Sequence, residues 1–143
     1  MSCKNRNYKS AQVAYNNNTQ DIIATGTTVN VLGSLLTNTG CSIATVVNGF
    51  KINSSGLYRI HYTVTVAATA AGILTAQLYK DGVALPCTLV QNTVADGDTY
   101  TIDIEAPALC LSTCCNICPT ITAIVGGVTG TINYTCASAL KLA

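Results

Sequence analysis

The sequence predicts an all-β fold, a two-sheet antiparallel sandwich, and three observations lead to it. Thr, Val and Ile together make up 45 of the 143 residues, and β-branched side chains suit pleated, half-buried strands better than helices. Apolar and polar residues alternate with a period of two in the clearest segments. Turn residues such as Gly, Asn and Asp separate these segments at the short spacing of a sandwich. The length corresponds to one domain.

The first twenty residues differ from the rest of the chain, because they are polar, rich in Asn and without alternation. We therefore divide the chain into an arm, residues 1–20, and a sandwich domain, residues 21–143. The arm carries three basic side chains and no acidic one: Lys4, Arg6 and Lys9. Such a segment is either a disordered terminus or an anchor that orders on a partner. The anchor is the functional hypothesis.

The strand candidates follow in order along the sandwich domain. Alternation is clearest at residues 58–66, where Tyr58, Ile60 and Tyr62 interleave with polar residues, and it recurs at residues 100–104. Asp81-Gly82 fits the two-residue type I′ turn of a hairpin. Further strands are expected at residues 22–32, 43–52, 73–80, 83–90, 120–125 and 131–142.

Composition excludes several classes of function. Charged residues are only 9% of the chain and the net charge is +1, which does not fit a nucleic-acid-binding surface. No apolar run reaches the roughly 18 to 20 residues of a membrane-spanning helix, and no secretory signal is visible at the N-terminus. One His and six carboxylates are a small inventory for acid–base chemistry. We expect no catalytic residues and no cofactor, and neither nucleic acid nor a membrane as partner.

The strongest strand is part of a longer motif. Residues 50–62 read Phe50-Lys-Ile-Asn-Ser-Ser-Gly56-Leu-Tyr58-Arg-Ile60-His-Tyr62. This resembles the F-x5-G-x-Y-x-F-x-[FY] signature of the complement C1q and tumour necrosis factor superfamily, with Ile60 in place of the usual Phe. The resemblance covers roughly residues 20–143. It implies a ten-strand jelly roll that assembles as a compact homotrimer.

The resemblance also implies where the subunits meet. In the superfamily, the strands that correspond to residues 58–66 and 100–104 are neighbours in the sheet that faces the trimer axis. Alternation places the polar residues of both strands outside the monomer core. We therefore expect a trimer interface in which basic groups offset acidic ones, made of Arg59, His61, Thr63, Asp103 and Glu105.

Four of the eight cysteines are crowded into one segment with the spacing C-x3-C-C-x2-C: Cys110, Cys114, Cys115 and Cys118. Four thiolates could hold a structural zinc ion. The adjacency of Cys114 and Cys115 argues against this, because neighbouring side chains of an extended segment point in opposite directions. Disulfides or free thiols are the other interpretations, and three pairings within the segment stay open.

Among enzyme, binding module and structural protein, the sequence favours the structural class. A domain of this kind with a short polar arm ahead of it resembles small bacteriophage proteins that decorate the phage head as trimers or fibres. We expect the arm to dock on a capsid or other virion protein, at the surface of a virion assembled in the bacterial cytoplasm. One alternative is a trimeric spore-surface protein of the exosporium type. Another is a carbohydrate- or receptor-binding module, with a host surface glycan as its partner.

Overall fold

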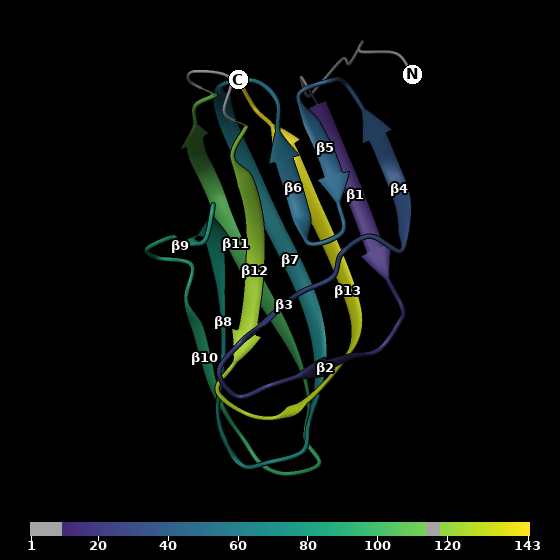
Figure 1. The fold of residues 1–143 in the computed structure, drawn as a ribbon, viewed down its shortest axis with the longest axis vertical. Coiled ribbons are helices and arrows are strands. Elements are labelled where there is room, and N and C mark those ends of the chain that lie inside the picture. The colour runs from purple at the N-terminus through teal and green to yellow at the C-terminus, as the bar shows by residue number, and fades with distance from the viewer. Residues whose placement is uncertain (1–9, 114–117) are drawn as a thin grey trace.

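Two antiparallel β-sheets pack face to face in the computed structural model, which describes residues 10–113 and 118–143 (Figure 1). Within these ranges, no helix is long and apolar enough to cross a membrane. Buried side chains from both sheets form one apolar cluster between them. The fold is therefore all-β, as the composition predicts.

Sheet A contains both strands that the alternation identifies most clearly. Its strands lie in the order β11-β7-β13-β1-β4, and β2 pairs with β13. Their bounds are β1 (Ser10–Asn16), β2 (Gln20–Ile22), β4 (Ser34–Thr39), β7 (Gly56–Ala68), β11 (Thr99–Leu111) and β13 (Gly130–Lys141). β7 pairs with β11 on one side and with β13 on the other, so its inward side chains lie in the centre of the core.

Sheet B covers the opposite side of the core. Its strands lie in the order β10-β8-β12-β6-β5, while β3 pairs with β12 and β9 pairs with β8. Their bounds are β3 (Thr27–Thr28), β5 (Ile43–Val46), β6 (Gly49–Ile52), β8 (Gly72–Lys80), β9 (Val83–Ala84), β10 (Val90–Val94) and β12 (Thr120–Gly126). Asp81 and Gly82 both have positive φ, 49° and 82°, as a type I′ turn requires.

Three strand expectations need correction. Residues 22–32 hold only the end of β2 and the short β3, although Val29 and Val31 are buried. Residues 43–52 form two strands, β5 and β6, which pair with each other. Residues 83–90 hold the short β9 and only the first residue of β10. β4 is a further strand that shows no alternation, because it lies at a sheet edge and is largely exposed.

The boundary between arm and sandwich at residue 20 is wrong. Residues 10–16 form β1, which pairs with β13 on one side and β4 on the other. Three of the four side chains that β1 directs into the sandwich are polar, namely Ser10, Gln12 and Asn16, and the fourth is the small Ala14. Ser10 accepts a hydrogen bond from the Ser42 amide at 2.9 Å, and Gln12 accepts one from the Thr45 hydroxyl at 2.8 Å. Because these buried polar groups are paired, the polar side of the strand can face inward, which is the reverse of the usual pattern.

The motif at residues 50–62 supplies the centre of the core. Phe50, Tyr58, Ile60 and Tyr62 are fully buried, and the rings of Phe50 and Tyr62 meet edge to face with centroids 6.0 Å apart. Gly56 is required for a close approach of the chain end, since a Cβ there would lie 2.4 Å from the Ala143 carbonyl oxygen.

Candidate self-association face

The polar side chains of β7 and β11 form a continuous row on the outer face of sheet A. Arg59 donates from Nη2 and Nε to Glu105 Oε2, at 2.7 and 3.0 Å. His61 Nε2 lies 3.2 Å from Asp103 Oδ1, and the Thr63 hydroxyl donates to the same oxygen at 2.8 Å. The structure thus brings together all five residues that the sequence assigned to an interface, and pairs opposite charges as expected. We call them the charged row.

Strand register explains why these residues meet. β11 runs antiparallel to β7 with Asp103 opposite Thr63 and Glu105 opposite His61. Side chains of successive residues point to opposite sides of a sheet, so odd-numbered residues of both strands share the outer face. The Arg59–Glu105 pair is diagonal and stays partly exposed, with 49% and 36% of the two side chains accessible. In the isolated subunit it is therefore a surface ion pair.

Beside the charged row, the same outer face of sheet A carries a group of less polar side chains from β1 and β13. Cys136 of β13 is opposite Thr63 on one side and Tyr15 of β1 on the other. The rings of Tyr15 and Tyr134 lie 6.4 Å apart between centroids. Desolvation, together with the neighbouring Cys136, raises the pKa of Tyr134. We call Val13, Tyr15, Tyr134 and Cys136 the apolar half.

The sequence analysis missed the apolar half for two different reasons. Tyr15 and Val13 were assigned to the arm, although Ala11, Val13 and Tyr15 do alternate. On β13, the register shifts between Ile132 and Tyr134, which interrupts the period. Residues 134–140 show no clear apolar–polar alternation, because their buried positions hold Thr135, Ala137 and Ala139.

A pocket of about 210 Å³ adjoins the charged row at the edge of the sandwich. The segment between β9 and β10 forms one wall, with Leu85 and Pro86, and β11 forms the other, with Pro107 and Leu109. β11 is irregular here, since its register against β7 shifts between Ala106 and Leu109. Glu105 lines this pocket and also pairs with Arg59, so the pocket and the charged row are continuous.

The predicted cysteine site is only partly within the described residues. Cys110 and Cys118 are free thiols, so neither forms the disulfide considered for it. Cys114 and Cys115 lie outside the described residues, and a disulfide or metal at that segment stays a prediction. Cys41 is disulfide-bonded. Within residues 10–113 and 118–143, no three His, Cys, Asp or Glu side chains come together as metal ligands would.

The basic residues assigned to the anchor, Lys4, Arg6 and Lys9, also lie outside the described residues. Their role in docking stays a prediction. The segment that could serve as an arm is now shorter, because the sheet already begins at Ser10.

Comparison with solved structures identifies the architecture. The PRD1 vertex protein P5 superposes with a TM-score of 0.63 at 14% identity, over 95% of this chain and 99% of that one. The globular domain of a zebrafish complement 1qA protein gives 0.65 at 10% identity, over 94% and 97%. Murine APRIL gives 0.66 at 11% identity, over 93% and 98%.

The fold is the C1q/TNF jelly roll. The coverage extends over nearly the whole length of each compared chain, so the likeness concerns the complete sandwich and not one sheet of it. No protein-family model and no curated protein matches the sequence itself. The names of the similar structures are those of a vertex protein, a complement domain and a signalling-type ligand rather than of enzymes.

Proposed function

We propose that this chain is a non-enzymatic structural protein of a virus particle, a homotrimer whose jelly rolls project from the surface. The observation that carries the proposal is the likeness of the whole chain to a phage vertex protein. It agrees with the resemblance of residues 50–62 to a superfamily of homotrimers. Docking on a capsid or other virion protein is assigned to residues 1–9, with Lys4, Arg6 and Lys9.

The outer face of sheet A is the proposed contact between subunits. Its apolar half leaves Tyr134 with 37% of its surface exposed, and an exposed apolar patch rimmed by polar residues is typical of an interaction site. Its charged row would fix the register of that contact, because complementary charges disfavour wrong alignments. Closing the sandwich against a copy of itself would thus cover apolar surface while keeping each charge paired.

The two edges of sheet A differ in a way that suits a closed ring. β11 carries the pocket with Leu85 and Leu109, whereas β4, at the opposite edge, exposes Leu36 on 64% of its surface. In a cyclic trimer, each contact joins one surface of a subunit to a different surface of its neighbour. An edge with an exposed leucine and an edge with a partly apolar pocket are the kind of pair that such a contact needs.

Light scattering tests the trimer directly. The expected mass is three times the chain mass of 14.8 kDa, and a mass of one chain would refute the assembly. Antibody labelling of purified particles tests the location: the chain should be accessible on intact particles, and its absence from them would refute the virion assignment.

The cysteines provide a second test that locates the contact. Cys136 lies in the apolar half on sheet A, whereas Cys118 lies just ahead of β12 of sheet B, and both are free thiols of intermediate exposure. Under reducing conditions, iodoacetamide should modify Cys118 in the assembled protein and spare Cys136, and both should react once the trimer is dissociated. If Cys136 reacts as fast as Cys118 in a trimer, the subunits meet through another surface.

A further inference from the structure

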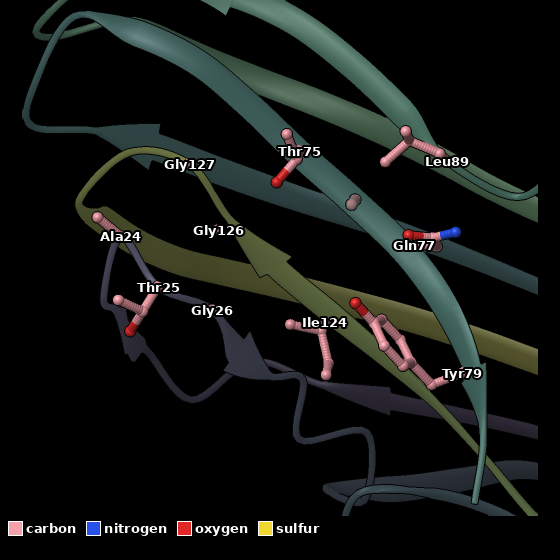
Figure 2. Close-up of a pocket in the computed structure, with 11 residues that line it drawn as sticks. Ala24, Thr25, Gly26, Thr75, Gln77, Tyr79, Leu89, Ile124, Gly126 and Gly127 are labelled. Atoms are coloured by element: carbon pink, nitrogen blue, oxygen red, sulfur yellow. The ribbon is translucent and has the colours of Figure 1, made fainter. Parts of the chain in front are cut away.

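Sheet B carries a shallow pocket of about 100 Å³ on its outer face, remote from the charged row on the other sheet (Figure 2). β8 and β12 form its floor. Ala24, Thr25 and Gly26, from the segment between β2 and β3, form one wall, and Leu89 stands on the other side. The pocket therefore combines four segments that are distant in sequence.

Glycines create this hollow. Gly126 lies opposite Thr75 in the ladder between β12 and β8, so no side chain fills the space beside Thr75. A Cβ on Gly126 would lie 2.9 Å from Gly26 Cα, so only glycine lets the wall approach the strand. The Gly127 amide donates to the Ala24 carbonyl at 2.9 Å, which fixes the wall in place.

The pocket presents hydrogen-bonding groups that the described part of the chain does not use. Thr75, Gln77 and Tyr79 follow one another at every second position of β8, on its outer side. Gln77 donates from Nε2 to the Leu85 carbonyl at 3.1 Å, which orients its amide and leaves Oε1 as an acceptor. The hydroxyls of Thr25, Thr75 and Tyr79 have no hydrogen-bond partner among the described residues.

Apolar surface lies next to these groups. Ile124 is opposite Gln77 in the ladder and diagonal to Tyr79, and Figure 2 shows its side chain beside the Tyr79 ring. Leu89 exposes 49% of its surface. No Lys, Arg, Asp or Glu contributes to the lining that the structure describes.

We propose that this pocket binds one neutral sugar ring, the terminal residue of a glycan. A pyranose presents hydroxyls at its rim and an apolar C–H face, which matches hydroxyl and amide groups beside Tyr79 and Ile124. A phosphate would require a positive charge or a cluster of free amides, and the lining has no positive charge. An extended peptide would require a free strand edge, but β8 and β12 are paired on both sides.

The small volume limits the affinity. Pockets for drug-sized ligands measure about 300 to 1,000 Å³, so this pocket of about 100 Å³ takes no more than a single ring, and we expect a Kd in the millimolar range. Several copies presented together would raise the avidity on a glycan-coated surface. That gain rests on the proposed trimer, whereas binding of one sugar to one subunit does not.

The test is an NMR titration of the isotope-labelled protein with methyl glycosides of glucose, galactose, mannose and N-acetylglucosamine. At least one should cause saturable shifts of the Gly26, Gly126 and Gly127 amides. Thr75→Val, which keeps the shape and removes one hydroxyl, and Tyr79→Phe should each weaken binding about threefold to tenfold, the usual effect of one neutral hydrogen bond. The matched control is Thr93→Val, on the same sheet face but outside the pocket.

Each outcome decides the proposal. Saturable shifts at the three glycines that weaken in both pocket variants and not in the control support it. Absence of saturable shifts with all four glycosides overturns it, and so do shifts that Thr75→Val and Tyr79→Phe leave unchanged. Amide spectra of the variants without ligand show whether they fold. A monomeric protein that binds sugar would refute the assembly and leave this inference intact.

Discussion

Replacing Arg59 with Glu separates the stability of the subunit from that of the assembly. In the single subunit, Arg59 and Glu105 form a partly exposed pair, and pairs of this kind contribute about 0 to 1 kcal/mol. The subunit should therefore lose no more than about 1 kcal/mol. If the charged row is buried between subunits, the substitution leaves Glu105 without its partner beside a second carboxylate. Breaking a buried ion pair costs about 3 to 5 kcal/mol.

The size of this effect decides what to measure. A loss of about 3 kcal/mol at each contact weakens it by more than about a hundredfold, and a trimer contains the contact three times. Light scattering over a dilution series should show dissociation of Arg59→Glu at concentrations where the parent protein is trimeric. Circular dichroism of the dissociated variant should still show a folded β-protein that unfolds cooperatively.

Two further variants make the result specific. Lys51→Glu has the same change in charge on the outer side of sheet B, at an exposed position of β6, and should leave the trimer intact. Glu105→Lys added to Arg59→Glu restores a pair of opposite charge and should recover part of the association. If Arg59→Glu assembles and melts like the parent protein, the charged row is exposed to solvent in the assembly and the proposed contact is wrong.

Three further predictions concern the core, the pH dependence and the N-terminus. Tyr58→Phe should lower the free energy of unfolding by about 1 kcal/mol, because it removes a 2.6 Å hydrogen bond from the Tyr58 hydroxyl to the Ser54 carbonyl. Tyr62→Phe should leave the free energy of unfolding unchanged or raise it, because the buried Tyr62 hydroxyl has no partner among the described residues. Equal losses for the two variants in urea unfolding would contradict this. Burial raises the pKa of Tyr62 above its ordinary value of 10.0. The contribution of this tyrosine to the free energy of unfolding is therefore complete below pH 10 and decreases as the pH rises further. Urea midpoints measured from pH 8 to pH 11 should fall for the parent protein and fall less for Tyr62→Phe. Deletion of residues 2–9 should leave a folded protein with reduced incorporation into particles. Deletion of residues 2–20 should abolish folding, because it removes β1, which is paired on both sides. Soluble, folded protein from the longer deletion would show that β1 is dispensable.

The elements that sequence analysis predicted well are those in which one face is apolar and the other polar. β7 has both faces clearly marked, and so has the first half of β11, so period-two alternation identified their inner and outer sides. The same pattern placed the five residues of the charged row outside the core. That their two strands are neighbours was implied by the resemblance to the superfamily, and the opposite charges then indicated the pairing.

β1 could not be predicted in this way. Its buried side chains include Ser10, Gln12 and Asn16, and its outward side chains include Val13 and Tyr15, so the usual polarity of a strand is reversed. Each buried polar group finds its partner in a loop or strand far along the chain, such as Thr45 for Gln12. Alternation identifies the buried face only where buried side chains are apolar. Hydrogen bonds to residues far along the chain allow polar side chains to be buried, so polarity no longer indicates which face of β1 is outside.

The reversed polarity of β1 also bears on the proposed assembly. A strand at the surface of a monomer would gain by directing Tyr15 inward and Asn16 outward, since burying apolar area is favourable and burying polar groups is not. β1 has the opposite orientation, and its outward Tyr15 joins Tyr134 in the apolar half. The buried polar groups of β1 are paired, so the cost to a subunit alone is the apolar area left on the outer face, and a second copy that covers this face of sheet A would bury that area. The same strand that obscured the fold in the sequence thus supplies the strongest physical argument that this face is a contact between subunits.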